Sequence, residues 1–232
     1  MNILAFDTCF DACSVAVGRG MRSLSPVIVE NFEPMQTGHA EKLVPMIEDA
    51  MARAGLKFSK LDRIAVTIGP GTFTGARIGV SAARALALVT AAPVVTVSSL
   101  RLMAFSPEIL SSPEKTIAIA TDARRGEVYF ERFEHRNMAS LGGPQLLAVA
   151  DAAVALGEAP SLIAGSGAQA VAEAAQAQGR VARAILPGLL PDALDMLFRA
   201  AEWLPGGAPS PLYLRAPDAK PPAPSPFIGA AA

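Results

Sequence analysis

The residues best suited to chemistry are three glycines that follow a short apolar run. Gly69, Gly71 and Gly75 come directly after residues 64–68, which are β-branched or small. A glycine-rich turn between a strand and a helix is a pattern that binds nucleotide phosphates. Here the spacing is one residue longer than the dinucleotide fingerprint, and no acid follows at the distance where a ribose hydroxyl is held. No lysine follows the last glycine, so a P-loop is not indicated either.

Two aspartates stand at the ends of apolar runs, one in each half of the chain. Asp7 and Asp122 occupy the places where actin-like ATPases carry acids that face phosphate and metal. No glycine stands two positions after either aspartate, because Cys9 and Arg124 occur there, so close approach of the backbone to a phosphate is not expected. The charged turn that holds Asp122, Arg124 and Arg125 fits either a solvated hairpin or a contact with a partner protein or RNA.

Metal ligands and nucleophiles are few. His39 and His135 are the only histidines, and the pair Cys9 and Cys13 has no second pair to complete a zinc site. We therefore interpret both cysteines as small buried residues and expect no metal site. Ser166 lies between two glycines but lacks the Gly-x-Ser-x-Gly pattern of hydrolase nucleophiles. It fits a plain turn or an anion cradle at the start of a helix.

Gly69, Gly71 and Gly75 belong to a predicted strand–turn–helix unit over residues 63–91. The apolar run at 64–68 is typical of a strand covered on both faces. Thr72 is suited to cap the following helix, because its hydroxyl can accept from backbone N–H groups of the first turn. No proline interrupts residues 73–90, which supports one long helix.

One face of this helix consists of small residues. Gly75, Gly79, Ala83 and Ala87 recur every four positions and share one stripe. Two glycines inside a helix cost about 1 kcal/mol each relative to alanine, so a close neighbour should compensate. Packing inside the monomer, a subunit interface and a phosphate at the helix start are three explanations of the stripe.

The rest of the chain predicts two related halves. Residues 117–122 and 127–133 repeat the strand–turn–strand plan of residues 2–7 and 14–18, which indicates an internal duplication. The predicted domains are a first lobe at 1–105, a second lobe at 116–215 and a proline-rich, mobile tail at 216–232. Further predicted elements are strands at 26–31, 94–97 and 162–164, and helices at 38–54, 98–105, 151–156, 168–178 and 191–203.

The composition of the chain limits the classes of function that it can support. The 232 residues are 51% hydrophobic with a formal net charge of −1, which gives no global electrostatic argument for binding nucleic acid or membranes. No apolar run approaches the length of a membrane span, and the first ten residues lack the basic start of a signal peptide. The expectation is a cytoplasmic protein with no membrane contact.

Four motifs together resemble one family. GPGTFTGARIG (69–79), GHAEKLVPMI (38–47), TDARRGEVYF (121–130) and PLYLR (211–215) occur in the order typical of TsaB, also called YeaZ. The resemblance covers residues 1 to about 215. The departures are Thr72 for serine, Ala76 for leucine and Ala40 for serine. The resemblance implies an α/β protein with the actin-like ASKHA (ribonuclease H-like) fold, in which two related lobes each carry a mixed sheet flanked by helices.

The resemblance also implies a function without catalysis in this chain. The TsaB family supports a catalytic paralogue, TsaD, which transfers a threonylcarbamoyl group to N6 of adenosine 37 in tRNAs that read codons beginning with A. An ATPase, TsaE, joins the complex, and ATP and metal are expected on the partner subunits, so no cofactor is expected in the isolated chain. Catalytic relatives carry a His-x3-His metal pair, whereas here Leu43 stands four residues after His39. Contact with tRNA is expected through the complex.

The family forms its dimer contact from the two helices of the first lobe. The implied interface residues are His39, Leu43, Met46, Ala50, Thr72, Phe73, Gly75, Arg77, Gly79 and Ala83. On this view the stripe faces outward, so a leucine at Gly79 should block association without unfolding the monomer. A homodimer through the same face is one alternative. An independent enzyme of this fold, a small-molecule kinase or a peptidase-like protein, is another.

Overall fold

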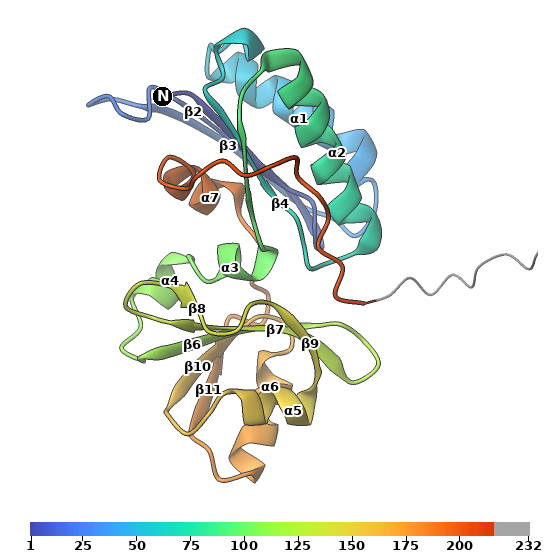
Figure 1. The fold of residues 1–232 in the computed structure, drawn as a ribbon, viewed down its shortest axis with the longest axis vertical. Helices are drawn as coiled ribbons and strands as arrows, with labels where there is room; N and C mark the ends of the chain where they lie inside the picture. The colour runs from blue at the N-terminus through green and yellow to red at the C-terminus, as the bar shows by residue number, and fades with distance from the viewer. Residues whose placement is uncertain (216–232) are drawn as a thin grey trace, which may run out of the picture.

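The computed structural model describes residues 1–215, and the tail predicted at 216–232 lies outside the described residues. The chain forms two lobes stacked along the longest axis of the molecule (Figure 1). The first sheet has the order β3-β2-β1-β4-β5, with β1 antiparallel to β2 and parallel to β4. Its strands are β1 (Ile3–Asp7), β2 (Ala12–Arg19), β3 (Val27–Pro34), β4 (Arg63–Thr67) and β5 (Val94–Val97).

The second lobe repeats this plan. Its sheet has the order β11-β10-β6-β7-β8, with β9 also paired to β7. The strands are β6 (Thr116–Asp122), β7 (Glu127–Glu134), β8 (Ala139–Ser140), β9 (Gln145–Ala148), β10 (Ser161–Ala164) and β11 (Ala182–Ile185). In both sheets a central strand pairs with its hairpin partner on one side and with parallel strands on the other. The predicted duplication and the two-lobed, actin-like α/β fold are therefore confirmed.

The strand–turn–helix unit forms as predicted. Strand β4 leads into the turn, and helix α2 (Phe73–Thr90) follows it. The Thr72 hydroxyl accepts a hydrogen bond from the Gly75 N–H at 3.0 Å, which caps the helix. A Cβ atom at Gly71 would lie 2.2 Å from the carbonyl oxygen of Cys9, so only glycine lets this turn pack against the β1–β2 turn.

Helices cover both faces of the first sheet. Helices α1 (His39–Arg53) and α2 lie side by side on one face (Figure 1). Their inner sides share one core with the sheet, which includes Leu4, Phe6, Val15, Leu43, Ile47, Ile64, Val66 and Ala83. The short helix η1 (Phe58–Lys60) precedes β4, while α5 (Val149–Ala155) and α6 (Ala168–Ala177) pack on the second sheet.

Each lobe is completed by a helix from the other half of the sequence. Helix α7 (Ala193–Ala200) packs on β1, β2 and β4 of the first lobe, where Met196 and Leu197 are fully buried. Helix α3 (Ser99–Met103) places Leu100 and Met103 against the second sheet, close to α4 (Pro107–Leu110). The lobes predicted at 1–105 and 116–215 thus each contribute one helix to the other lobe. The exchange arises because each sheet has a second apolar face that its own half leaves uncovered.

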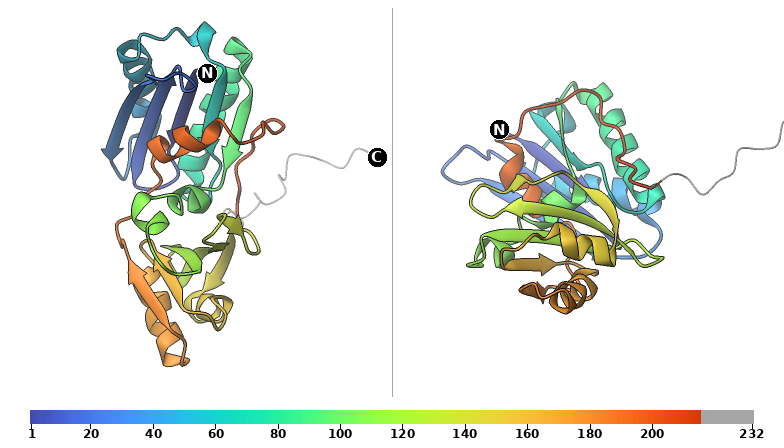
Figure 2. Two further views of the ribbon diagram at one scale, coloured as in Figure 1. Left: turned by 90° about the vertical axis from the view of Figure 1, so that its left-hand side faces the viewer. Right: turned by 60° about the horizontal axis from the view of Figure 1, so that its bottom comes forward.

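The last described residues run back over both lobes. We call residues 205–215 the C-terminal strap; Figure 2 shows it in red, beside the first sheet. The Gly206 N–H donates to Val94 O, and the Leu212 N–H donates to Ile68 O at 2.7 Å. Within residues 1–215 no helix is long and apolar enough to cross a membrane.

Candidate partner interface and interlobe cleft

The inner residues of the two helices are part of the protein core. Leu43, Met46, Ala50 and Ala83 are all buried against the first sheet. They were expected to contact a partner, and the structure contradicts this. The heptad-like spacing that identified them marks the side of each helix that meets its own sheet.

The glycine stripe also faces inward. A Cβ atom at Gly75 would lie 2.0 Å from the backbone oxygen of Thr8, and one at Gly79 would lie 2.9 Å from the Thr8 hydroxyl. Thr8 Oγ1 also donates to Gly75 O at 2.7 Å. The predicted close neighbour exists, but it is the β1–β2 turn of the same chain. Gly75 and Gly79 therefore cannot form the floor of an external contact, and a leucine at Gly79 would disrupt the monomer.

His39 positions the same turn. Its side chain is buried, and Nε2 lies 2.9 Å from Phe10 O, so the ring links the start of α1 to the residue after Cys9. The described residues contain no group of three histidine, cysteine or acidic side chains that could hold a metal ion. The contact with Phe10 O links α1 to the β1–β2 turn, and the buried His39 side chain leaves little surface for a partner.

An exposed surface does remain on these helices. Val44, Glu48 and Ala52 of α1 are exposed at intervals of four residues, as are Ser81 and Ala85 of α2, with Leu88 one turn further. We call these six residues the outer helical face. Leu88 is 88% and Val44 53% exposed, while the serine and alanines leave room for another helix to come close. This face carries the same four-residue period as the inner stripe, which is the signal that could have identified it.

A cluster of aromatic residues and arginine lies where α2 begins. Arg77 stacks over the Phe73 ring at 3.6 Å, and its Nε donates to the Tyr213 hydroxyl at 2.7 Å. The Phe73 and Tyr213 rings lie 4.9 Å apart. Thr72, Phe73 and Arg77 are exposed, so an interface role for these three is compatible with the structure. Tyr213 of the PLYLR motif is the third member of this cluster.

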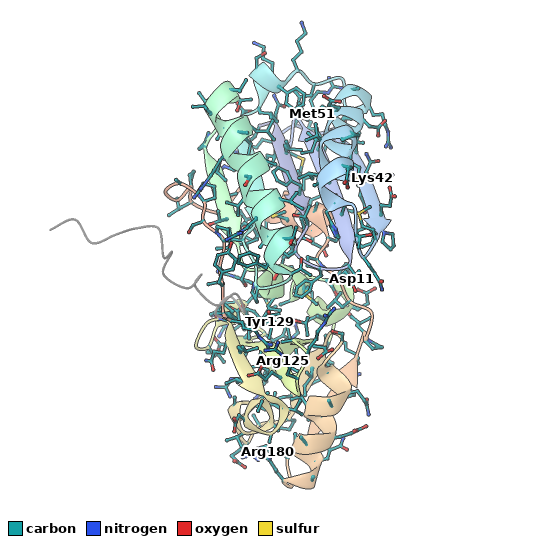
Figure 3. The ribbon with its side chains drawn as sticks, turned by 90° about the vertical axis from the view of Figure 1, so that its right-hand side faces the viewer. Asp11, Lys42, Met51, Arg125, Tyr129 and Arg180 are labelled. Atoms are coloured by element: carbon teal, nitrogen blue, oxygen red, sulfur yellow. The ribbon has the colours of Figure 1, made fainter. Side chains whose placement is uncertain are left out.

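An interlobe cleft of about 760 Å³ separates the two sheets at this end of α2. It brings Thr72 and Phe73 of the first lobe together with Asp122 and Arg124 of the second. Figure 3 shows Asp11 above Tyr129 at the same junction, with Arg125 close by. Other lining residues are Phe10, Thr121, Ser166, Leu189, Leu190 and Arg215.

The turn after Asp122 is held by the chain itself. Asp122 Oδ1 accepts from the Arg124 N–H at 2.8 Å, and Ser166 Oγ accepts from the Asp122 N–H at 2.9 Å. Arg124 and Arg125 both adopt left-handed backbone angles, with φ of 64° and 58°. Ser166 therefore supports this turn. The exposed side chains of Asp122, Arg124 and Arg125 are accessible to a partner.

Asp7 does not face the cleft. It is fully buried and accepts from the Thr67 hydroxyl and from the Cys9 N–H, the latter at 3.1 Å. Burial raises its pKa to about 6 against these hydrogen bonds, which lower it. With these donors and Thr8 already used inside the chain, the β1–β2 turn does not fit a nucleotide phosphate. The prediction of two buried free cysteines is confirmed, and burial raises the pKa of both Cys9 and Cys13.

Comparisons with known proteins agree on one family. Residues 33–199 match the family model described as TsaD, tRNA N6-adenosine threonylcarbamoyltransferase. The chain is 35% identical over 134 residues to the tRNA threonylcarbamoyladenosine biosynthesis protein TsaB of Escherichia coli, a match that covers 58% of the chain and 55% of the relative. For the TsaB of Haemophilus influenzae the identity is 38%, over 57% of the chain and 53% of the relative. The chain thus matches about half the length of these curated relatives.

Other relatives are matched over nearly their full length. An uncharacterised protein of Mycobacterium tuberculosis is 34% identical, over 95% of the chain and 94% of the relative. The solved structure of YeaZ from Pseudomonas aeruginosa has a TM-score of 0.73 at 29% identity, and covers 92% of this chain and 99% of its own. A second Pseudomonas aeruginosa structure, described as similar to peptidase YeaZ, has a TM-score of 0.76 at 30% identity, with the same coverage. On the shared motifs, the two-lobed fold and these matches, the chain belongs to the TsaB/YeaZ family.

Proposed function

We propose that this chain is a non-catalytic subunit of the machinery that forms threonylcarbamoyladenosine in tRNA. In this proposal it binds and supports the catalytic paralogue TsaD, together with the ATPase TsaE. Transfer to N6 of adenosine 37 takes place on TsaD, in tRNAs that read codons beginning with A. The curated relatives support the pathway, because they are named as tRNA threonylcarbamoyladenosine biosynthesis proteins.

The outer helical face is the observation that carries the proposed scaffold role. A side chain as exposed as Leu88 loses apolar contact with water when a partner covers it. Ser81 and Ala85 beside it allow two helix backbones to come close. A stable interface of about 1,200–2,000 Å² would need both helices and could extend to the cluster of Phe73, Arg77 and Tyr213.

The interior of the first lobe supports a role without catalysis. Asp7 is enclosed, and its two oxygens accept from Thr67 and Cys9 of the same chain. A catalytic acid of this fold would need to reach phosphate or metal in the cleft. ATP and metal are accordingly assigned to the partner subunits in this proposal.

The interlobe cleft favours a second candidate, an independent enzyme such as a small-molecule kinase or a peptidase-like protein. A hollow of about 760 Å³ lined by arginine, hydroxyl and aromatic side chains is large enough for a small substrate. Isothermal titration of the purified chain with ATP separates the scaffold from a kinase, and an assay for peptide hydrolysis separates it from a peptidase-like protein. The scaffold proposal expects no micromolar binding of ATP and no hydrolysis, and either activity would support the enzyme.

The scaffold proposal is tested by co-purification with the TsaD of the same organism. Leu88→Arg places a charge on the outer helical face and should abolish the complex and tRNA modification in a reconstituted system. Val154→Arg is the matched control, because Val154 is also an exposed helical residue but belongs to α5 of the second lobe. Both variants should keep the melting temperature of the unmodified protein. An intact complex with Leu88→Arg would refute this use of the face.

A further inference from the structure

The two edges of the first sheet differ. At one edge, Val94 of β5 accepts a backbone hydrogen bond from Gly206 of the C-terminal strap. At the other edge lies β3, eight residues long. Within residues 1–215, β2 is the one strand paired with β3, and no further backbone hydrogen bond reaches its outer side. A long uncovered edge is a template for an added strand.

The register identifies the free backbone groups of β3. Met35 N–H donates to Asp11 O at 3.0 Å, directly after the last paired residues Ala12 and Pro34. Because hydrogen-bonded pairs alternate along an antiparallel ladder, the odd-numbered residues of β3 bond to β2. The N–H and C=O groups of Ile28, Glu30 and Phe32 therefore point away from the sheet and are available to another strand.

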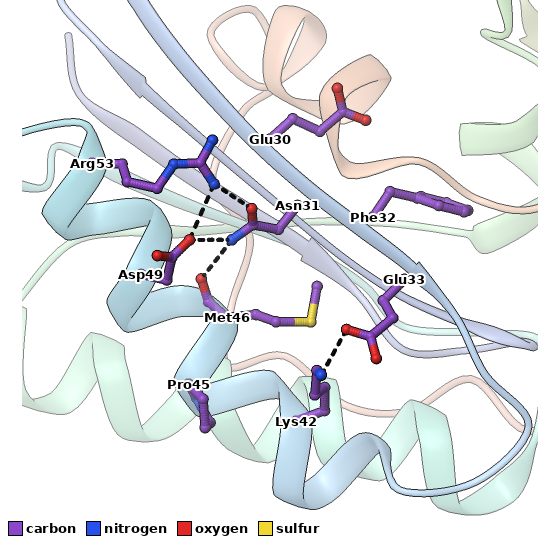
Figure 4. A pocket seen from close by; sticks show the side chains of 9 residues that line it. All are labelled: Glu30, Asn31, Phe32, Glu33, Lys42, Pro45, Met46, Asp49 and Arg53. Atoms are coloured by element: carbon purple, nitrogen blue, oxygen red, sulfur yellow. Dashed lines mark hydrogen bonds and ion pairs between the residues drawn. The ribbon is translucent and has the colours of Figure 1, made fainter.

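On the α1 side, a hollow of about 560 Å³ runs along this edge. Residues 30–33 of β3 form one wall, and Pro45 and Met46 of α1 contribute apolar surface (Figure 4). The charges around it are paired, since Lys42 binds Glu33 at 2.7 Å and Arg53 binds Asp49 at 3.1 Å. Apart from Glu30, which points toward α7, the charges of this hollow cancel, so the α1 side of an added strand meets no net charge and uncharged side chains such as valine suit it.

The α7 side of the same edge is acidic. Glu30 points toward α7 in Figure 4, where Asp192 and Asp195 lie. Burial and the charges of Asp192, Glu108 and Glu30 raise the pKa of Asp195 to about 6, with Arg199 opposing them. Burial and Asp192 likewise raise the pKa of Glu30. These carboxylates repel one another, so a cation bound among them would relieve the repulsion. Phe32 on the same side is 38% exposed, and its ring could stack against the same cation.

We propose that β3 binds an extended segment of another protein as an added strand, with lysine or arginine at alternate positions on the α7 side and apolar residues on the α1 side. Strand addition obtains affinity from main-chain hydrogen bonds and specificity from alternate side chains. A second copy of this chain does not fit. Two β3 strands paired about a two-fold axis would place both sets of Glu30, Asp192 and Asp195 on the same side, where like charges repel.

The test uses the full chain and a fluorescent nine-residue peptide of alternating lysine and valine, followed by fluorescence anisotropy. We expect saturable binding, and none with a peptide of alternating glutamate and valine. Glu30→Lys should weaken binding about tenfold or more, because it reverses the charge beside the added strand. Glu173→Lys is the matched control, since Glu173 is exposed on α6 of the second lobe and does not line the hollow, and it should leave binding unchanged.

Two further peptides test the backbone pairing without altering the protein. One carries N-methyl groups on the lysines and the other on the valines. Because only one edge of an added strand faces β3, one methylated peptide should bind and the other should not. The proposal is overturned if both methylated peptides bind equally, if the glutamate peptide binds as well as the lysine peptide, or if no peptide binds. Light scattering that shows a dimer lost on Glu30→Lys would overturn it in favour of self-association.

Discussion

Gly75→Ala isolates the contact between α2 and the β1–β2 turn. The new methyl group would lie 2.0 Å from Thr8 O, 2.6 Å from Thr72 Oγ1 and 3.1 Å from Thr8 C. Two of these atoms belong to the backbone, so a change of rotamer cannot relieve the overlap. The β1–β2 turn would have to move, and with it the Thr8 hydroxyl bond to Gly75 O.

The sign of the effect is what makes this substitution informative. In an open helix, glycine to alanine stabilises by about 1 kcal/mol. Overpacking costs about 1–3 kcal/mol, and the lost hydrogen bond and displaced turn add to that. We therefore expect a net loss of about 2 kcal/mol in the free energy of unfolding, or roughly 4–8 °C in melting temperature. Urea denaturation followed by far-ultraviolet circular dichroism measures it.

Two other substitutions calibrate the result. Ala85→Gly on the exposed side of α2 measures the difference in helix propensity alone, and should lower the free energy of unfolding by about 1 kcal/mol. Gly79→Ala should be milder than Gly75→Ala, because its nearest obstacle at 2.9 Å is the Thr8 side chain rather than the backbone. A Gly75→Ala protein more stable than the unmodified chain would show that this face is open, and would return the stripe to the partner surface.

Further predictions concern buried carboxylates. Because the pKa of Asp7 is raised to about 6 from 3.8, the folded protein holds a proton there between about pH 4 and 6 that the unfolded chain releases. Protonated Asp7 therefore contributes about 3 kcal/mol to the free energy of unfolding below pH 4, and this contribution is lost as the pH rises through 6. The free energy of unfolding of Asp7→Asn should not show this pH dependence. Urea denaturation at several pH values between 4 and 7 measures it. Glu131 accepts hydrogen bonds from Ser98 Oγ at 2.8 Å and from Ser140 Oγ at 2.7 Å. Glu131→Ala removes both acceptors and should lower the free energy of unfolding by about 2 kcal/mol, whereas Glu131→Gln keeps one acceptor oxygen and should lower it by less. Melting curves of the two variants measure the difference. Equal effects of the two would contradict that account.

The sequence predicts local structure well where the signal is local. The strand at 64–68, the Thr72 cap and the helix at 73–90 follow from neighbouring residues, and all three are confirmed. The helix predicted at 38–54 is α1 within a residue at each end. Strands β8, β9 and β11 were missed, because each is short and lacks the run of apolar, β-branched residues that identified the predicted strands.

The candidate site was harder to predict because periodicity does not identify what a helix face meets. Gly75 and Gly79 correctly indicated a close neighbour, yet the β1–β2 turn and a partner helix would require the same small residues. Likewise, the helix predicted at 191–203 forms as α7, but its docking on the first lobe depends on contacts of Met196 and Leu197 with residues nearly 200 positions earlier. Which surface a helix packs against depends on the apolar area buried in the whole fold, and a local sequence pattern does not contain this information.

The exchange of helices between the lobes has a consequence during synthesis on the ribosome. The first sheet is complete once Val97 has emerged, but the face that α7 covers stays open until Ala200 follows, about 100 residues later. At elongation rates of about 5–20 residues per second this interval is about 5–20 s, during which Ile3, Ala5 and Val95 face solvent or a chaperone. The nascent first lobe is thus an aggregation-prone intermediate, and a stop codon after residue 105 should yield an insoluble product rather than an independent domain.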